Sequence, residues 1–108
     1  MINFYATFTD QDGDVIKQNF KVKKIVKGKP EEKNEYREIR LEDVAKISLL
    51  KSDEEQNSEE ILKRYQLFRK IYHKGEVELS EEEKTLLKKY ICISHDVIFA
   101  GQAIELIN

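Results

Sequence analysis

The first residues of the chain alternate between apolar and polar side chains, which is the period of a β-strand. Over residues 2–9 every second side chain is apolar. A second strand is predicted from Val15 to about Val26, with apolar positions at Ile16, Phe20, Val22 and Val26. The segment between the two strands, Asp10–Asp14, is polar and contains Gly13, as expected of a turn.

Matching the apolar faces of these two strands predicts their register. A three-residue loop over residues 11–13 pairs Phe8 with Ile16, Phe4 with Phe20 and Ile2 with Val22. All apolar pairs then lie on one face, and Gly13 takes the left-handed position of a glycine bulge. A two-residue loop would place Phe8 opposite Lys17 instead. We therefore predict an N-terminal antiparallel hairpin in the first register.

The alternation weakens after the second strand. Residues 28–34 are polar and include a glycine and a proline, which predicts a break. A short third strand over residues 35–40 is possible. Residues 41–50 are ambiguous, because Ala45, Ile47 and Leu49 alternate as in a strand. The acidic start and the helix-forming residues of that segment favour a helix.

Capping residues predict the starts of three further helices. The caps are Asn57 with Glu60, Ser80 with Glu83, and Asp96. Asp96 precedes a last segment over residues 97–107, which has strand composition at its start. A strand is therefore the alternative there, and we favour a helix.

The helix after Asn57 carries a broad apolar stripe. Its members are Ile61, Leu62, Tyr65, Leu67, Phe68, Ile71 and Tyr72. So wide a stripe predicts burial on two sides. Gly75 is expected to end this helix as its C′ residue, and residues 51–56 before it form a charged linker.

Together these elements predict an α+β fold in one domain covering residues 1–108. The β-rich part, residues 1–40, contains the antiparallel hairpin, and it packs on three to four α-helices from residues 41–108. A chain of 108 residues fits one core. Hydrophobic residues make up 40% of the chain, which argues against an intrinsically disordered protein.

Charge, hydropathy and cysteine content indicate the cellular compartment of the protein. The formal net charge is −2, divided into +2 over residues 1–51 and −4 over residues 52–108. The chain start lacks a basic segment followed by an apolar run, and no apolar run approaches the roughly 18 residues of a membrane span. We therefore expect a cytoplasmic protein without membrane association, in which the single cysteine, Cys92, is a buried reduced thiol.

Residue types that carry catalysis form no convergent set along the sequence. Asp10, Asp12 and Asp14 lack the glycine and glutamate spacing of a calcium loop, and a turn accounts for them. The run Ser94–Asp96 has the residue types of a catalytic triad, but adjacent residues cannot adopt that geometry. Two histidines and one cysteine cannot form a zinc site without carboxylates. We expect no enzyme, no cofactor and no metal.

One face of the second strand is rich in lysine. The candidate partner-binding residues on it are Lys17, Lys21, Lys23 and Lys27. They would steer an acidic protein partner, or contact the phosphates of a nucleic acid. A third interpretation is a solvated face whose lysines discourage edge-to-edge aggregation. Between the two partners a protein is favoured, because no arginine or aromatic residue shares that face of the second strand with these lysines.

Four motifs occur in a fixed order in the second half of the chain. They are leucine–acid–valine–alanine within Arg40–Ala45, arginine–tyrosine–x–leucine within Lys63–Leu67, valine–x–leucine–x–acid within Val77–Glu83, and glycine–glutamine within Gly101–Leu106. This pattern resembles a recurring family of small phage and prophage proteins. The resemblance covers most of residues 41–108 and loosely the hairpin, and the chain departs from it at residues 91–96 and in the lysine-rich strand.

The resemblance implies helices at residues 41–50 and 97–107, a viral or mobile-element origin, and no assigned catalytic residue. We therefore expect a phage protein that acts by protein–protein binding. One version is an inhibitor of a host defence nuclease, similar to an anti-CRISPR protein. The alternatives are an accessory protein of phage assembly or replication, and a weak nucleic-acid-binding protein that uses the lysine face. The oligomeric state stays open.

Overall fold

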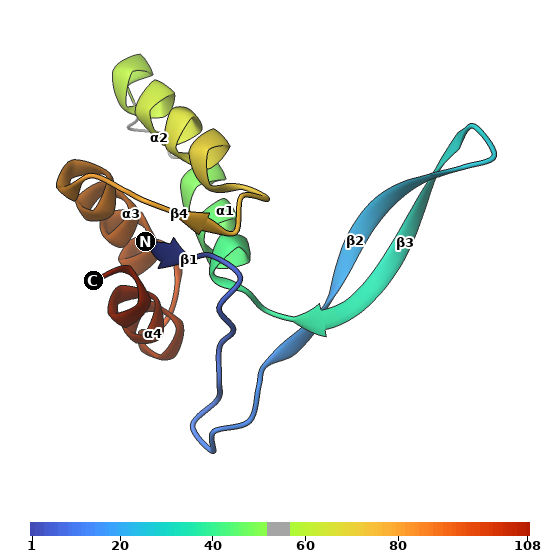
Figure 1. Cartoon of the computed structure of the whole chain (residues 1–108), viewed down its shortest axis with the longest axis horizontal. Coiled ribbons are helices and arrows are strands. Elements are labelled where there is room, and N and C mark those ends of the chain that lie inside the picture. The colour runs from blue at the N-terminus through green and yellow to red at the C-terminus, as the bar shows by residue number, and fades with distance from the viewer. Residues whose placement is uncertain (52–56) are drawn as a thin grey trace.

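The computed structural model describes residues 1–51 and 57–108, and its elements form an α+β fold. In chain order they are β1 (Ile2–Asn3), β2 (Lys17–Val26), β3 (Lys29–Glu38), α1 (Leu41–Leu50), α2 (Ser58–Ile71), β4 (Glu76–Val77), α3 (Glu81–Ser94) and α4 (Val97–Ile107). Figure 1 shows the four helices packed together with β1 and β4, while the β2–β3 hairpin extends away from them. We call residues 17–38 the arm and the other described residues the helical body.

Among the described side chains, the buried core lies in the helical body. Each helix contributes apolar side chains to it, among them Leu41, Ile71, Leu87 and Ile107. The segment before the arm adds Phe4 and Phe8, which are fully buried. Burial of a phenylalanine side chain contributes about 1.5–3 kcal/mol, so the N-terminal segment is held mainly by its phenylalanines.

The predicted pairing of residues 2–9 with the second strand holds next to the turn, where Thr9 pairs with Val15, and is wrong farther from it. β1 pairs with β4, so that Ile2 lies opposite Val77 rather than Val22. Phe4 likewise donates its backbone N–H to the Gly75 carbonyl at 2.8 Å. The physical reason is that the body core offers these apolar side chains complete burial, which a two-stranded hairpin cannot.

The predicted turn before the arm is confirmed. Thr9 bridges Val15 in the expected register, and Gly13 has a φ of +85°. The Asp10 carboxylate accepts the backbone N–H groups of Asp12 and Asp14 at 2.9 and 3.0 Å. A carboxylate that bonds its own turn is the usual role of aspartate here.

The third strand is longer than predicted and starts where a break was expected. β3 begins at Lys29 and pairs with β2 at ten consecutive positions, from Val26 opposite Lys29 to Lys17 opposite Glu38. The connection is the pair Lys27 and Gly28, with φ values of +53° and +77°. Positive φ at both central residues is the signature of a type I′ turn. The prediction failed because β3 is exposed on both faces over most of its length and therefore needs no apolar alternation.

Both ambiguous segments, 41–50 and 97–107, are helices, as favoured. The side chains of Asn57, Ser80 and Asp96 accept backbone N–H groups as predicted caps. The predicted two-sided burial of α2 is wrong. Its inward face buries Leu67 and Ile71, whereas three residues on another face are about half exposed, namely Ile61, Leu62 and Tyr65.

Two further expectations need correction. Gly75 does not end α2, because His73 already follows the cap residue Tyr72 in the left-handed region with a φ of +61°. Cys92 is exposed rather than buried. It follows the fully buried Ile91, and one residue turns a helix by about 100°, which carries the thiol away from the core. Of the predicted linker, residues 52–56 lie outside the described residues.

No helix within residues 1–51 and 57–108 is long and apolar enough to cross a membrane.

Candidate binding arm

The arm differs from the body in exposure and in charge. Every residue from Lys27 to Tyr36 is exposed. Residues 17–38 contain eight lysines and arginines against four glutamates, a formal charge of +4. The rest of the chain has eleven basic and seventeen acidic residues, a formal charge of −6. The fold therefore places a basic projection on an acidic body.

The strand register locates the predicted lysines. Lys17 and Lys21 are four positions apart in β2 and so share one face of the hairpin. Lys17 and Lys21 are exposed, and the side chain of Lys23 lies outside the described part. Lys27 is exposed in the turn, so it is at the tip of the arm rather than on the strand face.

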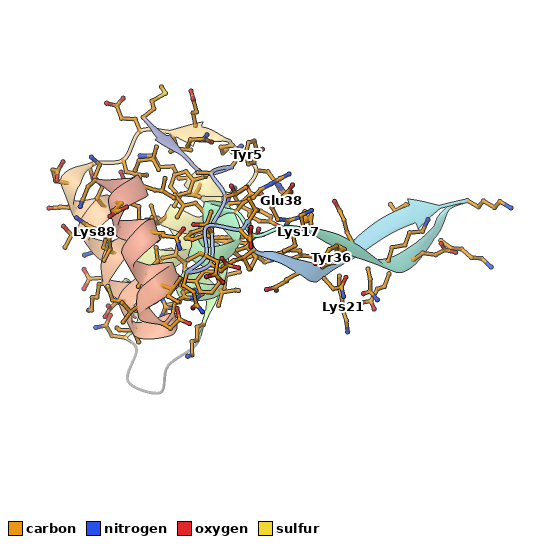
Figure 2. All side chains as sticks on the ribbon, turned by 90° about the horizontal axis from the view of Figure 1, so that it is seen from below. Tyr5, Lys17, Lys21, Tyr36, Glu38 and Lys88 are labelled. Atoms are coloured by element: carbon orange, nitrogen blue, oxygen red, sulfur yellow. The ribbon has the colours of Figure 1, made fainter. Side chains whose placement is uncertain are left out.

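Two exposed apolar residues share that face and were missed by sequence reasoning. Tyr36 is 67% exposed and lies opposite Asn19, and Ile25 is 81% exposed opposite Pro30. Figure 2 shows Lys21 and Tyr36 on the arm, beyond the helical body. The sequence feature that could have revealed them is Lys27-Gly28. A two-residue loop at this position pairs the following polar segment with β2 and so predicts the strand that carries Tyr36.

An ion pair anchors the arm to the body. Arg37 in β3 donates to both carboxylate oxygens of Asp43 in α1, at 2.8 and 2.9 Å. The Arg37 guanidinium also lies 3.9 Å from the ring centroid of Phe20. The hydrogen bonds that Arg37 donates to the Asp43 carboxylate raise the pKa of the guanidinium. Asp43 is itself fixed, because it accepts the Arg40 backbone N–H in the α1 capping box.

A small pocket lies where the arm meets the body, and we call it the base pocket. Its volume is about 210 Å³. It is lined by Gln18 and Phe20 of β2, by Ile39, Asp43, Val44 and Ile47, and by His95 and Phe99. A ring nitrogen of His95 lies 3.3 Å from the Val44 carbonyl oxygen. Burial lowers the pKa of His95, which favours its neutral form.

A second, larger hollow of about 740 Å³ follows the surface between α2 and α3. Its lining mixes lysines and glutamates, and Lys70 pairs with Glu83 across it at 2.9 Å. Nearby, the Tyr90 hydroxyl donates to the Glu60 carboxylate, and this bond lowers the pKa of Glu60. Because opposite charges satisfy one another here, this surface is a weaker candidate than the arm.

Two residues of the reactive types make hydrogen bonds within the fold. Asp96 accepts the Phe99 backbone N–H at 3.1 Å as a helix cap. The backbone N–H of His73 donates to the Glu42 carboxylate, at 3.2 Å. Over the described ranges no group of three or more histidine, cysteine, aspartate or glutamate side chains is arranged to hold a metal ion.

No known protein family, curated protein or solved structure matches this chain.

Proposed function

We propose that this chain is a non-catalytic binding protein that inserts its arm into a protein partner. The observation that carries the proposal is the arm itself, which extends away from the helices (Figure 1). It has its own charge and exposed apolar residues. A two-stranded hairpin without a covered face is marginally stable in water. A partner that covers Tyr36 and Ile25 would supply the apolar contact that the arm lacks within the chain.

The charge pattern of the arm favours a protein over a nucleic acid. Lys17 lies opposite Glu38 across the hairpin, and the arm contains three further glutamates. Such neighbours partly cancel the positive field that phosphates require. Tyrosine is enriched among the residues that dominate protein interfaces. A nucleic acid is the second candidate, because the arm still has a net charge of +4.

The biological setting is also a proposal and rests on the resemblance to small phage proteins. An inhibitor of a host defence nuclease fits a small protein with segregated charge, since an oriented field steers association. An accessory protein of phage assembly or replication fits the same features. If excess protein leaves the activity of candidate nucleases unaltered, the inhibitor version fails while the binding proposal stands.

The test compares the full chain with an arm-shortened chain in which Asn-Gly replaces residues 21–34. This change joins the cross-strand partners Phe20 and Glu35 through a favoured two-residue turn, and it keeps the base of the arm. Both proteins are used as bait in host and phage-infected lysates, with Lys74→Gln as a control for loss of one exposed lysine on the body. We expect the shortened chain to lose the specific partner and the control to retain it. Retention by the shortened chain would refute the proposal.

The nucleic-acid alternative has its own measurement. Fluorescence anisotropy with single- and double-stranded DNA and RNA at increasing salt would show binding that falls steeply with salt concentration if the arm contacts phosphates. Absence of binding at low salt would remove this alternative.

A further inference from the structure

We propose that the free edge of β2 binds an extended acidic segment of the partner as an added strand, and that the base pocket receives one apolar side chain of that segment. This inference rests on the proposed function and names the chemistry of the partner and its binding mode.

The hydrogen bonds between β2 and β3 show which backbone groups of β2 remain available to an added strand. Ile39 donates its N–H to the Ile16 carbonyl at 3.0 Å, just below the first β2–β3 pair. Backbone groups of an antiparallel strand point alternately to its two sides. Even-numbered residues of β2 therefore face β3, and odd-numbered ones such as Asn19 and Lys21 face outward. Within residues 1–51 and 57–108, β2 has β3 as its one strand neighbour.

The two edges of the arm are not equivalent. β3 contains Pro30, which has no N–H group, and four glutamates. β2 contains neither proline nor an acidic residue and has four lysines. Opposite charges on neighbouring strands stabilise their pairing, and like charges destabilise it. The β2 edge thus favours an acidic strand and opposes the β2 strand of a second copy.

The base pocket extends this edge toward the body. Gln18 and Phe20 belong to β2 and form one wall, so a strand beside β2 would pass the pocket as it approaches the body. At about 210 Å³ the pocket is smaller than the roughly 300–1,000 Å³ of small-molecule sites. Ile39, Val44, Ile47 and Phe99 make the lining largely apolar. One aliphatic or aromatic side chain matches both the size and the lining.

The test selects random dodecapeptides by display on the full chain, with counter-selection on the arm-shortened chain. We expect enriched peptides to share a net negative charge and one conserved apolar residue. In spectra of the ¹⁵N-labelled chain with the best synthetic peptide, the amides of odd-numbered β2 residues should shift most, together with those around Phe20 and Ile47. Failure to enrich arm-dependent peptides, or enrichment without acidic bias, would overturn the inference.

Matched variants examine the edge directly. Lys21→Pro removes an outward N–H from β2, and Asn34→Pro removes an outward N–H from the opposite position on β3. We expect Lys21→Pro to weaken peptide binding about five- to tenfold, in line with loss of one hydrogen bond, and Asn34→Pro to leave it unchanged. Lys21→Gln removes the side-chain charge but keeps the backbone N–H, so it measures the contribution of the charge alone. Ile47→Arg should block the base pocket. If Lys21→Pro disorders the arm, the amide shifts of the unsubstituted chain still show whether the peptide binds at the β2 edge.

The outcomes also separate this inference from the proposed function. If the arm is required for the lysate partner but the selected peptides shift residues around Tyr36 instead of the β2 edge, the added-strand mode is wrong and the binding function stands. If β2 edge amides become protected through concentration-dependent dimerisation of the protein alone, the occupant is a second copy, and the acidic segment is refuted.

Discussion

The ion pair between Arg37 and Asp43 is expected to couple the arm to the stability of the body. The two side chains are 19% and 8% exposed, so water screens the pair weakly. Arg37→Ala removes two hydrogen bonds to Asp43, a third to the Glu38 carbonyl oxygen and the contact with the Phe20 ring. We expect it to lower the free energy of unfolding by about 3 kcal/mol. Asp43→Asn keeps an oxygen for the Arg40 N–H and should cost less, about 2 kcal/mol.

A double-mutant cycle isolates the pair itself. Urea unfolding of the four proteins, followed by helical circular dichroism at neutral pH, should give a coupling free energy of about 2 kcal/mol between Arg37 and Asp43. The control cycle is Lys70→Ala with Glu83→Gln, whose side chains are 45% and 29% exposed in the native pair. Its coupling should stay below about 0.5 kcal/mol. If both cycles gave the same small value, the arm would not be anchored by this pair.

Three further changes test the local geometry. Lys27→Asn relieves a positive φ in the turn, so amide exchange along the arm should slow by the equivalent of up to about 1 kcal/mol, and unchanged exchange would contradict the turn assignment. Ser80→Ala removes the oxygen that accepts the Glu83 N–H at 3.2 Å and should cost about 1 kcal/mol in urea unfolding, whereas Thr85→Ala in the same helix should cost nothing. Burial lowers the pKa of His95 in the folded state, so the unfolded state binds more protons as pH falls through about 6.5. Stability should therefore fall as pH is lowered through that value. Equal pH dependence in His95→Gln would contradict that assignment.

Features encoded by neighbouring residues were predictable from the sequence. The caps at Ser80 and Asp96 depend on a side chain and a backbone group three positions apart, so their residue types are sufficient evidence. The turn at Gly13 is local in the same sense. The pairing of Ile2 with Val77 spans 75 positions, and no local pattern distinguishes it from the pairing with Val22. What decided between them was burial in the helical core, which depends on the assembled body.

The candidate site was predictable in part for the same reason. Period-two alternation was enough to place Lys17 and Lys21 on one exposed face. Tyr36 joins that face through β3, whose polar sequence carries no apolar signal, and Arg37 meets Asp43 only after α1 has formed. The sequence therefore indicated the lysines of the arm but not the second strand that completes its surface, nor the anchor that fixes its direction.

The length of the arm separates its positive charge from the acidic residues of the body. Ten residues of β-strand extend about 33 Å, whereas charges are screened over about 8 Å at physiological ionic strength. The acidic residues of the body therefore cancel little of the positive potential near Lys27 at the tip. If the same lysines were folded against the body, their field would be neutralised by its acidic residues. A projecting hairpin anchored at Arg37 thus lets a chain of net negative charge present a basic surface.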